Sequence, residues 1–154
     1  MVNAIDIDLE RARGVAASVV DPEIPVLTIA DLGILRDVAL DGDVVVVTIT
    51  PTYSGCPAMR QIEDDIVATL DRHGFTARVQ VRHHPAWTTA WMSDSARLSL
   101  NEFGIAPPTA PEAVHCPRCQ ADAPRTVSRF GSTACKALMV CRSCGEPFDY
   151  FKQY

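Results

Sequence analysis

The first half of the chain switches between helical and extended patterns of apolar residues. Apolar side chains recur at three- and four-residue steps over about residues 6–19, which predicts an amphipathic helix. Two β-branched segments follow at 34–40 and 44–50, and Asp41-Gly42 between them is typical of a hairpin turn. The second segment is almost continuously β-branched, so we expect it in the centre of a sheet.

The pattern then returns to helical spacing after Pro57, a residue suited to a first helical turn. Apolar residues keep that spacing until Gly74, which favours the end of a helix. A strand is predicted at 75–81 and a second, or broken, helix at 88–103. The order helix–strand–strand–helix–strand–helix predicts an α+β domain with a small sheet.

A change of composition divides the chain. Residues 107–111 hold three prolines, which predicts a stiff linker between a domain at 1–106 and a module at 112–154. Residues 1–111 have 8 Arg and 15 acidic residues (net −7), whereas 112–154 have 6 basic and 4 acidic residues (net +2). A module of roughly 40 residues needs a metal or another staple to supplement its small core.

Overall composition excludes several classes of protein. The net charge of −5 and pI near 5.2 argue against nucleic-acid binding. No apolar run reaches the ~18 residues of a membrane span, and the acidic start of the chain does not resemble a signal peptide. We therefore expect a cytoplasmic protein, in which six cysteines indicate metal or thiol chemistry rather than disulfides.

Four of those cysteines have the spacing of a metal site. Two Cys-x-x-Cys pairs are separated by 21 residues, and each pair brings two sulfurs to one ion. Four thiolates close a tetrahedron, so we expect a structural zinc, while iron or an iron–sulfur cluster remains open. A disulfide within each pair is the weaker alternative. The predicted ligands are Cys116, Cys119, Cys141 and Cys144.

Two further cysteines stand apart from this set. Cys56 lies between a strand and a helix, where the helix N-terminus should lower its pKa; a reactive or metal-binding thiol and a packing residue are both open. Asp21 and Glu23, in a proline-flanked loop, cap a helix, solvate a surface, or assist that thiol by holding a metal. Cys135 beside Lys136 is a spare ligand, a reactive thiol or a buried apolar residue.

Three motifs occur in the order of a known domain: Asp21-Pro22-Glu23, Asp31-Leu32-Gly33, and Thr48-Ile49-Thr50-Pro51 leading to Gly55-Cys56-Pro57. Over about residues 8–82 the chain resembles the SufT-type iron–sulfur assembly domains, found also in the eukaryotic cytosolic iron–sulfur targeting complex. The resemblance implies a role in iron–sulfur protein maturation, with Cys56 as the functional thiol, a transient holder of iron or cluster, and Asp21 and Glu23 as the acidic loop.

The later segments Cys-Pro-Arg-Cys, Ser-Arg-Phe-Gly-Ser-Thr-Ala-Cys-Lys-Ala-Leu and Glu-Pro-Phe-Asp-Tyr-Phe-Lys extend the resemblance over nearly the whole chain. Together with the first domain they resemble the small accessory subunits encoded with phenylacetyl-CoA epoxidases. This implies a non-catalytic maturation factor whose partners are the oxygenase and reductase subunits, with Cys135 in a characteristic segment. The sequence leaves open whether the chain forms a homodimer. It also leaves open two other functions: a metalloprotein that carries electrons or a labile cluster, and a zinc-ribbon module that binds other proteins or regulates.

Overall fold

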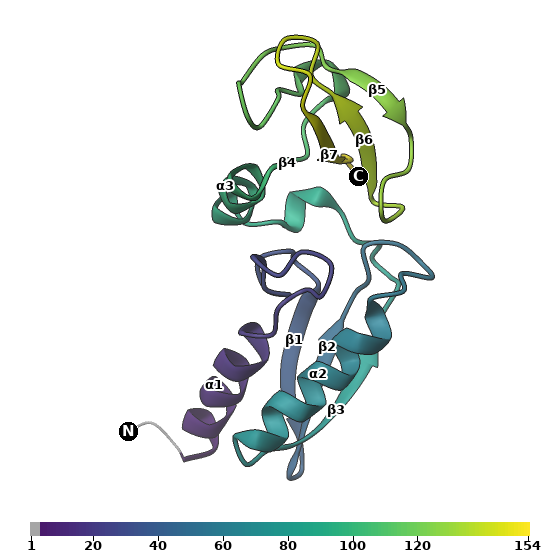
Figure 1. The fold of residues 1–154 in the computed structure, drawn as a ribbon. Coiled ribbons are helices and arrows are strands. Elements are labelled where there is room, and N and C mark those ends of the chain that lie inside the picture. Colours follow the sequence, from purple (N-terminus) through teal and green to yellow (C-terminus); the bar gives the residue numbers. More distant parts are fainter. Residues whose placement is uncertain (1–3) are drawn as a thin grey trace. The chain divides into compact units, whose positions relative to one another are not determined.

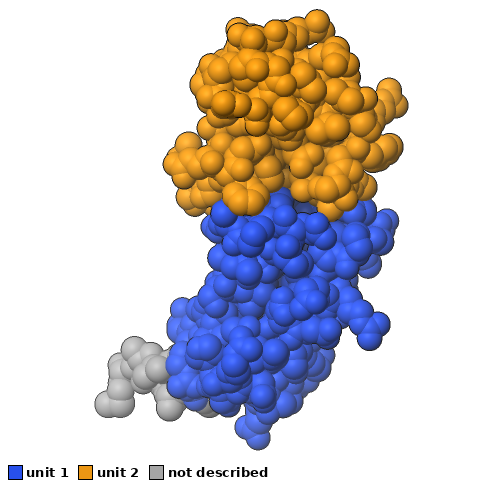
Figure 2. Space-filling view, in the orientation of Figure 1, with its two compact units in different colours: residues 1–87 blue, residues 88–154 orange. Residues whose placement is uncertain are grey.

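The computed structural model describes the backbone of residues 4–154 and the side chains of residues 8–154. The described chain forms two compact units, one ending at Trp87 and one spanning Thr88–Tyr154 (Figures 1 and 2). This division precedes the last predicted helix, whereas the composition placed a boundary at 107–111. No helix between residues 4 and 154 has the length and apolar character needed to cross a membrane.

The first unit is a three-stranded sheet with two helices packed against it. The strand order is β1-β2-β3, with β1 and β2 antiparallel and β2 and β3 parallel. The predicted α+β class and the central place of β2 are confirmed. The elements are α1 (Ala4–Ala17), β1 (Leu35–Asp41), β2 (Val44–Ile49), α2 (Met59–Arg72) and β3 (Thr76–Val81).

The core of this unit lies between the helices and the sheet. The inward-facing side chains of β2 alternate with period 2, and those of α2 recur every three or four residues. Trp87 also belongs to this unit, because its indole Nε1 donates a 2.8 Å hydrogen bond to the main-chain oxygen of Leu32. The fully buried residues include Ala12, Ala16, Val47, Ile49, Ile62, Ile66 and Leu70.

The second unit has a four-stranded sheet in the order β4-β7-β6-β5. The predicted broken helix is confirmed as a 3-10 turn at Thr89–Trp91 followed by α3, which is capped by Ser93 and ends at the left-handed Gly104. The elements are α3 (Asp94–Phe103), β4 (Ile105–Ala106), a 3-10 turn (Pro111–Ala113), β5 (Arg125–Ser128), β6 (Lys136–Val140) and β7 (Pro147–Phe151).

The proline-rich segment is packed within this second unit. The Arg97 guanidinium donates to the main-chain oxygen of Pro108 at 2.7 Å, and the Tyr150 hydroxyl donates to that of Thr109 at 2.6 Å. Pro108 is buried. Three prolines stiffen a segment, but these tertiary hydrogen bonds hold it against α3 and β7.

Hydrogen bonds join the first and last residues of the second unit. The main-chain oxygen of Tyr154 accepts hydrogen bonds from the Thr88 hydroxyl at 2.7 Å, the Thr89 hydroxyl at 2.9 Å and the Thr89 main-chain N–H at 3.1 Å. The unit is therefore closed on itself where the chain enters it.

Candidate functional site: a half-buried thiol and a four-cysteine cluster

Cys56 lies in the loop that connects the central strand β2 to helix α2. The loop turns at Gly55, whose φ of +83° is readily adopted only by glycine. The Cys56 N–H donates to the Tyr53 oxygen at 3.3 Å, and the Met59 N–H donates to the Cys56 oxygen at 3.2 Å. These hydrogen bonds fix the backbone and leave the thiol half-buried.

The electrostatic environment of this thiol differs from the expectation. Burial raises the pKa of Cys56 above its ordinary value. A hydrogen bond from the Ala58 backbone lowers that pKa, the charge of Asp21 raises it, and the side chains of Tyr53 and Thr52 lower it. The predicted lowering of the pKa is wrong, because α2 begins only at Met59 and desolvation outweighs the helix end.

Asp21 is held rigidly by backbone hydrogen bonds, and its charge acts on this thiol. It is 7% exposed, and its Oδ1 accepts hydrogen bonds from the backbone N–H groups of Glu23 at 2.7 Å and Ile24 at 2.9 Å. Its charge acts on Cys56, so the fold brings together two residues that are 35 positions apart. The Glu23 side chain is exposed, and no described contact joins its carboxylate to Cys56.

The sheet topology explains why the loop after β2 and the loop after β3 leave the sheet at the same end of its strands. The two strands are parallel, Ile49 pairs with Val81, and the Arg82 N–H donates to the Ile49 oxygen at 2.9 Å. His83 and His84 lie two and three residues after the end of β3, so the parallel pairing brings them to the carboxyl end of the strands, where the Cys56 loop also begins. Both are exposed, without a described contact to the thiol.

The four predicted metal ligands converge in the second unit. Their sulfur atoms all lie within 4.8 Å of one another. The Cys116–Cys144 and Cys119–Cys141 sulfur pairs are 3.8 and 3.5 Å apart. A tetrahedral ion with sulfur ligands at ~2.3 Å requires sulfurs about 3.8 Å apart. The donor set and its spacing therefore fit a tetrahedral metal ion.

The two cysteine pairs have matching backbone turns. The N–H groups of Cys116 and Cys141 each donate to the oxygen five residues later, at 3.0 and 2.9 Å. The N–H groups of Gln120 and Gly145 each donate back to the oxygen of the first cysteine, at 2.8 and 3.1 Å. Both of these residues have positive φ, 64° and 76°. Each turn thus positions its own two sulfurs.

Backbone donors also favour a thiolate at Cys141, the first cysteine of the second pair, whereas the pKa of Cys144 is raised to about 12. The N–H groups of Cys144 and Ser143 lie 3.4 Å from the Cys141 sulfur, and the pKa of Cys141 is lowered to about 6, chiefly by the Cys144 bond. An exposed ion pair of 2.6 Å between Arg118 and Glu146 links the two turns. The chemistry of the cluster is that of thiolate ligation.

Cys135 is not part of this cluster. It precedes β6, whereas Cys141 follows that strand, so roughly 20 Å of extended chain separates them. Cys135 is 8% exposed, and its sulfur lies 3.0 Å from the Thr133 hydroxyl. The next residue, Lys136, is buried with its ammonium 3.8 Å from Asp149 Oδ2. Lys136 stands out in the sequence, but its ion pair with Asp149 was not predicted.

Thr52 and Tyr53 were also missed as neighbours of the Cys56 thiol. Both precede it in the same loop, so a survey of hydroxyl residues within four positions of the cysteine could have found them.

Two family models match different parts of the chain. Residues 10–81 match the family model described as iron-sulfur cluster assembly protein, and residues 104–152 match that of the PaaD zinc beta ribbon domain. An Escherichia coli K12 protein, named as one subunit of a "Putative 1,2-phenylacetyl-CoA epoxidase", is 51% identical over 140 residues, which cover 86% of this chain and 85% of the relative. The chain belongs to the PaaD family.

Two further relatives match part of this PaaD-family chain and more than nine-tenths of their own length. The Bacillus subtilis Fe-S protein maturation auxiliary factor YitW is 36% identical over 59% of this chain and 91% of its own. A crystal structure of a domain of unknown function, DUF59, from Bacillus anthracis is 29% identical with a TM-score of 0.58, covering 63% of this chain and 94% of that one. The PaaD-family chain thus joins an assembly-type domain to a zinc-ribbon domain.

Proposed function

We propose that this chain is a cytoplasmic accessory factor that matures a phenylacetyl-CoA epoxidase by assisting assembly of its iron–sulfur cluster or iron centre. Its partners are the oxygenase and reductase subunits of that system. Support comes from the relative named for the epoxidase, which matches most of the chain, and from the relative of the first unit named for Fe-S protein maturation. In this proposal the chain handles a cargo and turns over no substrate of its own.

The observation that carries the proposal is the association of Asp21 with Cys56 in the first unit. A buried carboxylate, fixed by two backbone N–H groups, acts on a half-buried thiol whose loop is itself fixed by hydrogen bonds. A carboxylate beside a sulfur suits a cation as well as a proton, since either one neutralises the negative charges.

The raised pKa of Cys56 then has a chemical meaning. The free thiol stays protonated, which limits its oxidation and its reaction with other soft electrophiles. When iron(II) arrives as cargo, a sulfur–iron bond forms and the thiol proton is released to solvent. Asp21 compensates part of the charge that the cation brings. One thiol holds a cluster poorly, so the site suits transfer to a client better than storage.

The four-cysteine cluster has a separate role in this proposal. Zinc held by Cys116, Cys119, Cys141 and Cys144 staples the second unit. A closed set of four thiolates leaves no position for a reacting group. Metal analysis of the purified protein tests this assignment: one zinc per chain is expected, whereas iron with a visible absorption that bleaches on reduction would favour an electron carrier.

Complementation of an epoxidase system that lacks this chain tests the function. The Cys56→Ser variant should keep its fold and its metal content but fail to support epoxidase activity and the iron content of the purified oxygenase and reductase. Cys135→Ser is the matched control, a second thiol outside the cluster, and should complement. Full complementation by Cys56→Ser would refute the role of this thiol.

A third variant separates the roles of the two units. Cys119→Ser should lose the metal and unfold the second unit, as measured by metal content and thermal unfolding. A variant that lacks the metal and remains folded would refute the staple. Light scattering measures the molecular mass of the purified chain, alone and mixed with each client subunit, and so tests for a homodimer and for complexes with the clients.

A further inference from the structure

Strand β3 (Thr76–Val81) is an open edge of the sheet in the first unit. It pairs with β2 on one side and is the last strand in the order β1-β2-β3. The Arg82 N–H donates to the Ile49 oxygen in β2, so by alternation the even-numbered residues of β3 face β2. The backbone N–H and C=O groups of Ala77, Val79 and Val81 therefore point to the open edge.

The opposite edge of the same sheet, strand β1, is less suited to pairing with a further strand. Strand β1 has a register shift between Leu35 and Asp37, and such a bulge disrupts pairing with a further strand. Strand β3 keeps a continuous register of six pairs with β2 and contains no proline. Of the two edges, β3 retains the geometry that accepts an added strand.

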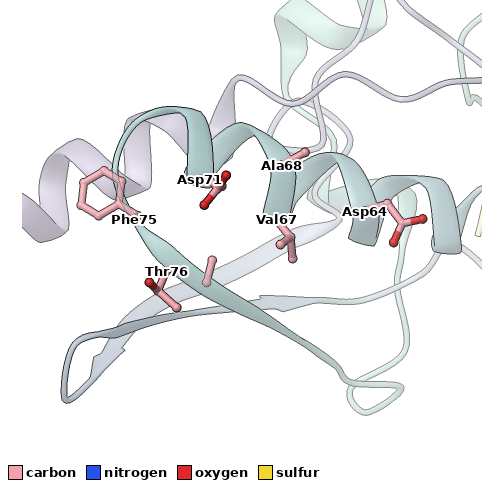
Figure 3. A pocket seen from close by; sticks show the side chains of 7 residues that line it. Asp64, Val67, Ala68, Asp71, Phe75 and Thr76 are labelled. Atoms are coloured by element: carbon pink, nitrogen blue, oxygen red, sulfur yellow. The ribbon is translucent and has the colours of Figure 1, made fainter.

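A groove of about 360 Å³ runs beside this edge, between β3 and α2 (Figure 3). On the helix it is lined by Asp64, Val67, Ala68 and Asp71, which share one face because they lie at steps of three and four residues. Ala77 belongs to the lining on the strand. The Val67 side chain is 40% exposed, so the apolar part of the groove is open to a ligand.

The charge of the groove is negative. Asp64 and Asp71 are both exposed, and neither takes part in an ion pair among the described residues. A second copy of the chain, paired through its own β3, would not supply matching cations to the groove. Arg78 lies on the other face of the strand from Ala77, and it already pairs with Asp41 at 2.9 Å.

We propose that the β3 edge and this groove bind an extended segment of a partner protein whose groove-facing side chains, at every second residue, are basic and apolar in turn. The segment adds a strand to β3, places apolar side chains against Val67, and sets its cations against Asp64 and Asp71. The groove is lined by none of the residues of the Cys56 loop, so this surface is a docking site in addition to the thiol. Strand addition with side-chain pockets is a common mode of peptide recognition.

Titration of the isotope-labelled protein with end-blocked eight-residue peptides tests the proposal. A peptide with the repeat Lys-Ser-Val-Ser (the Lys-Val peptide) presents Lys and Val in turn to one face, and it should shift the NMR amide resonances of Ala77, Val79 and Val81 and the methyl resonances of Val67. The matched Glu-Val peptide, with the repeat Glu-Ser-Val-Ser, should bind roughly fivefold more weakly or worse, because two exposed ion pairs contribute about 1 kcal/mol together. Absence of these shifts at millimolar Lys-Val peptide would overturn the proposal.

Charge reversal of the groove provides the second measurement. Asp64→Lys combined with Asp71→Lys should abolish the preference for the Lys-Val peptide. Asp43→Lys in the β1–β2 turn changes an exposed carboxylate of the same unit outside the groove and should preserve it. The proposal would be overturned if both variants showed the same preference for the Lys-Val peptide over the Glu-Val peptide. So would β3 resonances that shift with protein concentration alone, since a second copy would then occupy the edge.

Discussion

Gly131 approaches a buried ion pair more closely than any other residue type could. A Cβ atom added there would lie 2.6 Å from Asp149 Oδ1 and 3.4 Å from the Lys136 Cβ. The other carboxylate oxygen, Asp149 Oδ2, is 3.8 Å from the Lys136 ammonium, and the lysine side chain is only 4% exposed. We therefore expect Gly131→Ala to displace the carboxylate and weaken its pairing with a cation that cannot reach water.

The magnitude follows from two limits. Overpacking alone costs about 1–3 kcal/mol, and removing the partner of a buried charge costs about 3–5 kcal/mol. The Asp149 side chain is 27% exposed and can rotate toward solvent without losing the whole attraction. We expect a loss of about 2–4 kcal/mol, or a fall of roughly 10–30 °C in the Tm of a unit of this size.

Calorimetry of the metal-loaded protein measures the effect, with two further variants for comparison. Gly14→Ala in α1 meets no atom within 4 Å and should stabilise the first unit by about 1 kcal/mol. Gly131→Ala in an Asp149→Ala background should cost almost nothing more than Asp149→Ala alone. An unchanged Tm for Gly131→Ala, or additive losses in the double variant, would refute the proposed clash.

Three other variants test separate contacts. Asp21→Asn keeps an oxygen that can accept the backbone hydrogen bonds but removes a charge that raises the pKa of Cys56. Alkylation of Cys56 by iodoacetamide should therefore reach its half-maximal rate at a lower pH, and an unchanged pH profile would contradict the electrostatic coupling. Trp87→Phe removes the donor to the Leu32 oxygen and should cost the first unit about 1–2 kcal/mol in urea unfolding, and no loss would mean that this bond is dispensable. Arg118→Gln removes an exposed ion pair with Glu146 and a positive charge that also acts on Cys144 and Cys116, and the metal affinity should fall less than tenfold; a larger loss would contradict a minor role for this residue.

Local patterns were sufficient for the elements of the first unit, whereas the strands β4 and β7 of the second unit were not predicted. The β-branched run at 44–50 is buried as a central strand because such residues suit a strand flanked on both sides, and the helix after Pro57 has its expected apolar face. The four-cysteine cluster was also predictable, since each Cys-x-x-Cys turn is a short-range feature and the two turns have the spacing of a known template.

Features that depend on distant residues were not predictable in the same way. The pKa of Cys56 depends on burial and on Asp21, and neither is encoded in the residues beside the thiol. The segment at 107–111 has the composition of a spacer, but Arg97 and Tyr150 bind its main chain. A composition describes how stiff a segment is, whereas its contacts decide whether it moves independently.

The hydrogen bonds between Thr88, Thr89 and the Tyr154 main chain affect how the second unit opens. In most domains the two ends fray independently, and each exchanges its amide hydrogens at its own rate. Here the Thr89 N–H donates to Tyr154 and the Tyr154 N–H donates to the Thr89 hydroxyl, so neither end can detach without releasing the other. Fraying of this unit is consequently a single event, and the two amides should exchange at similar, slow rates.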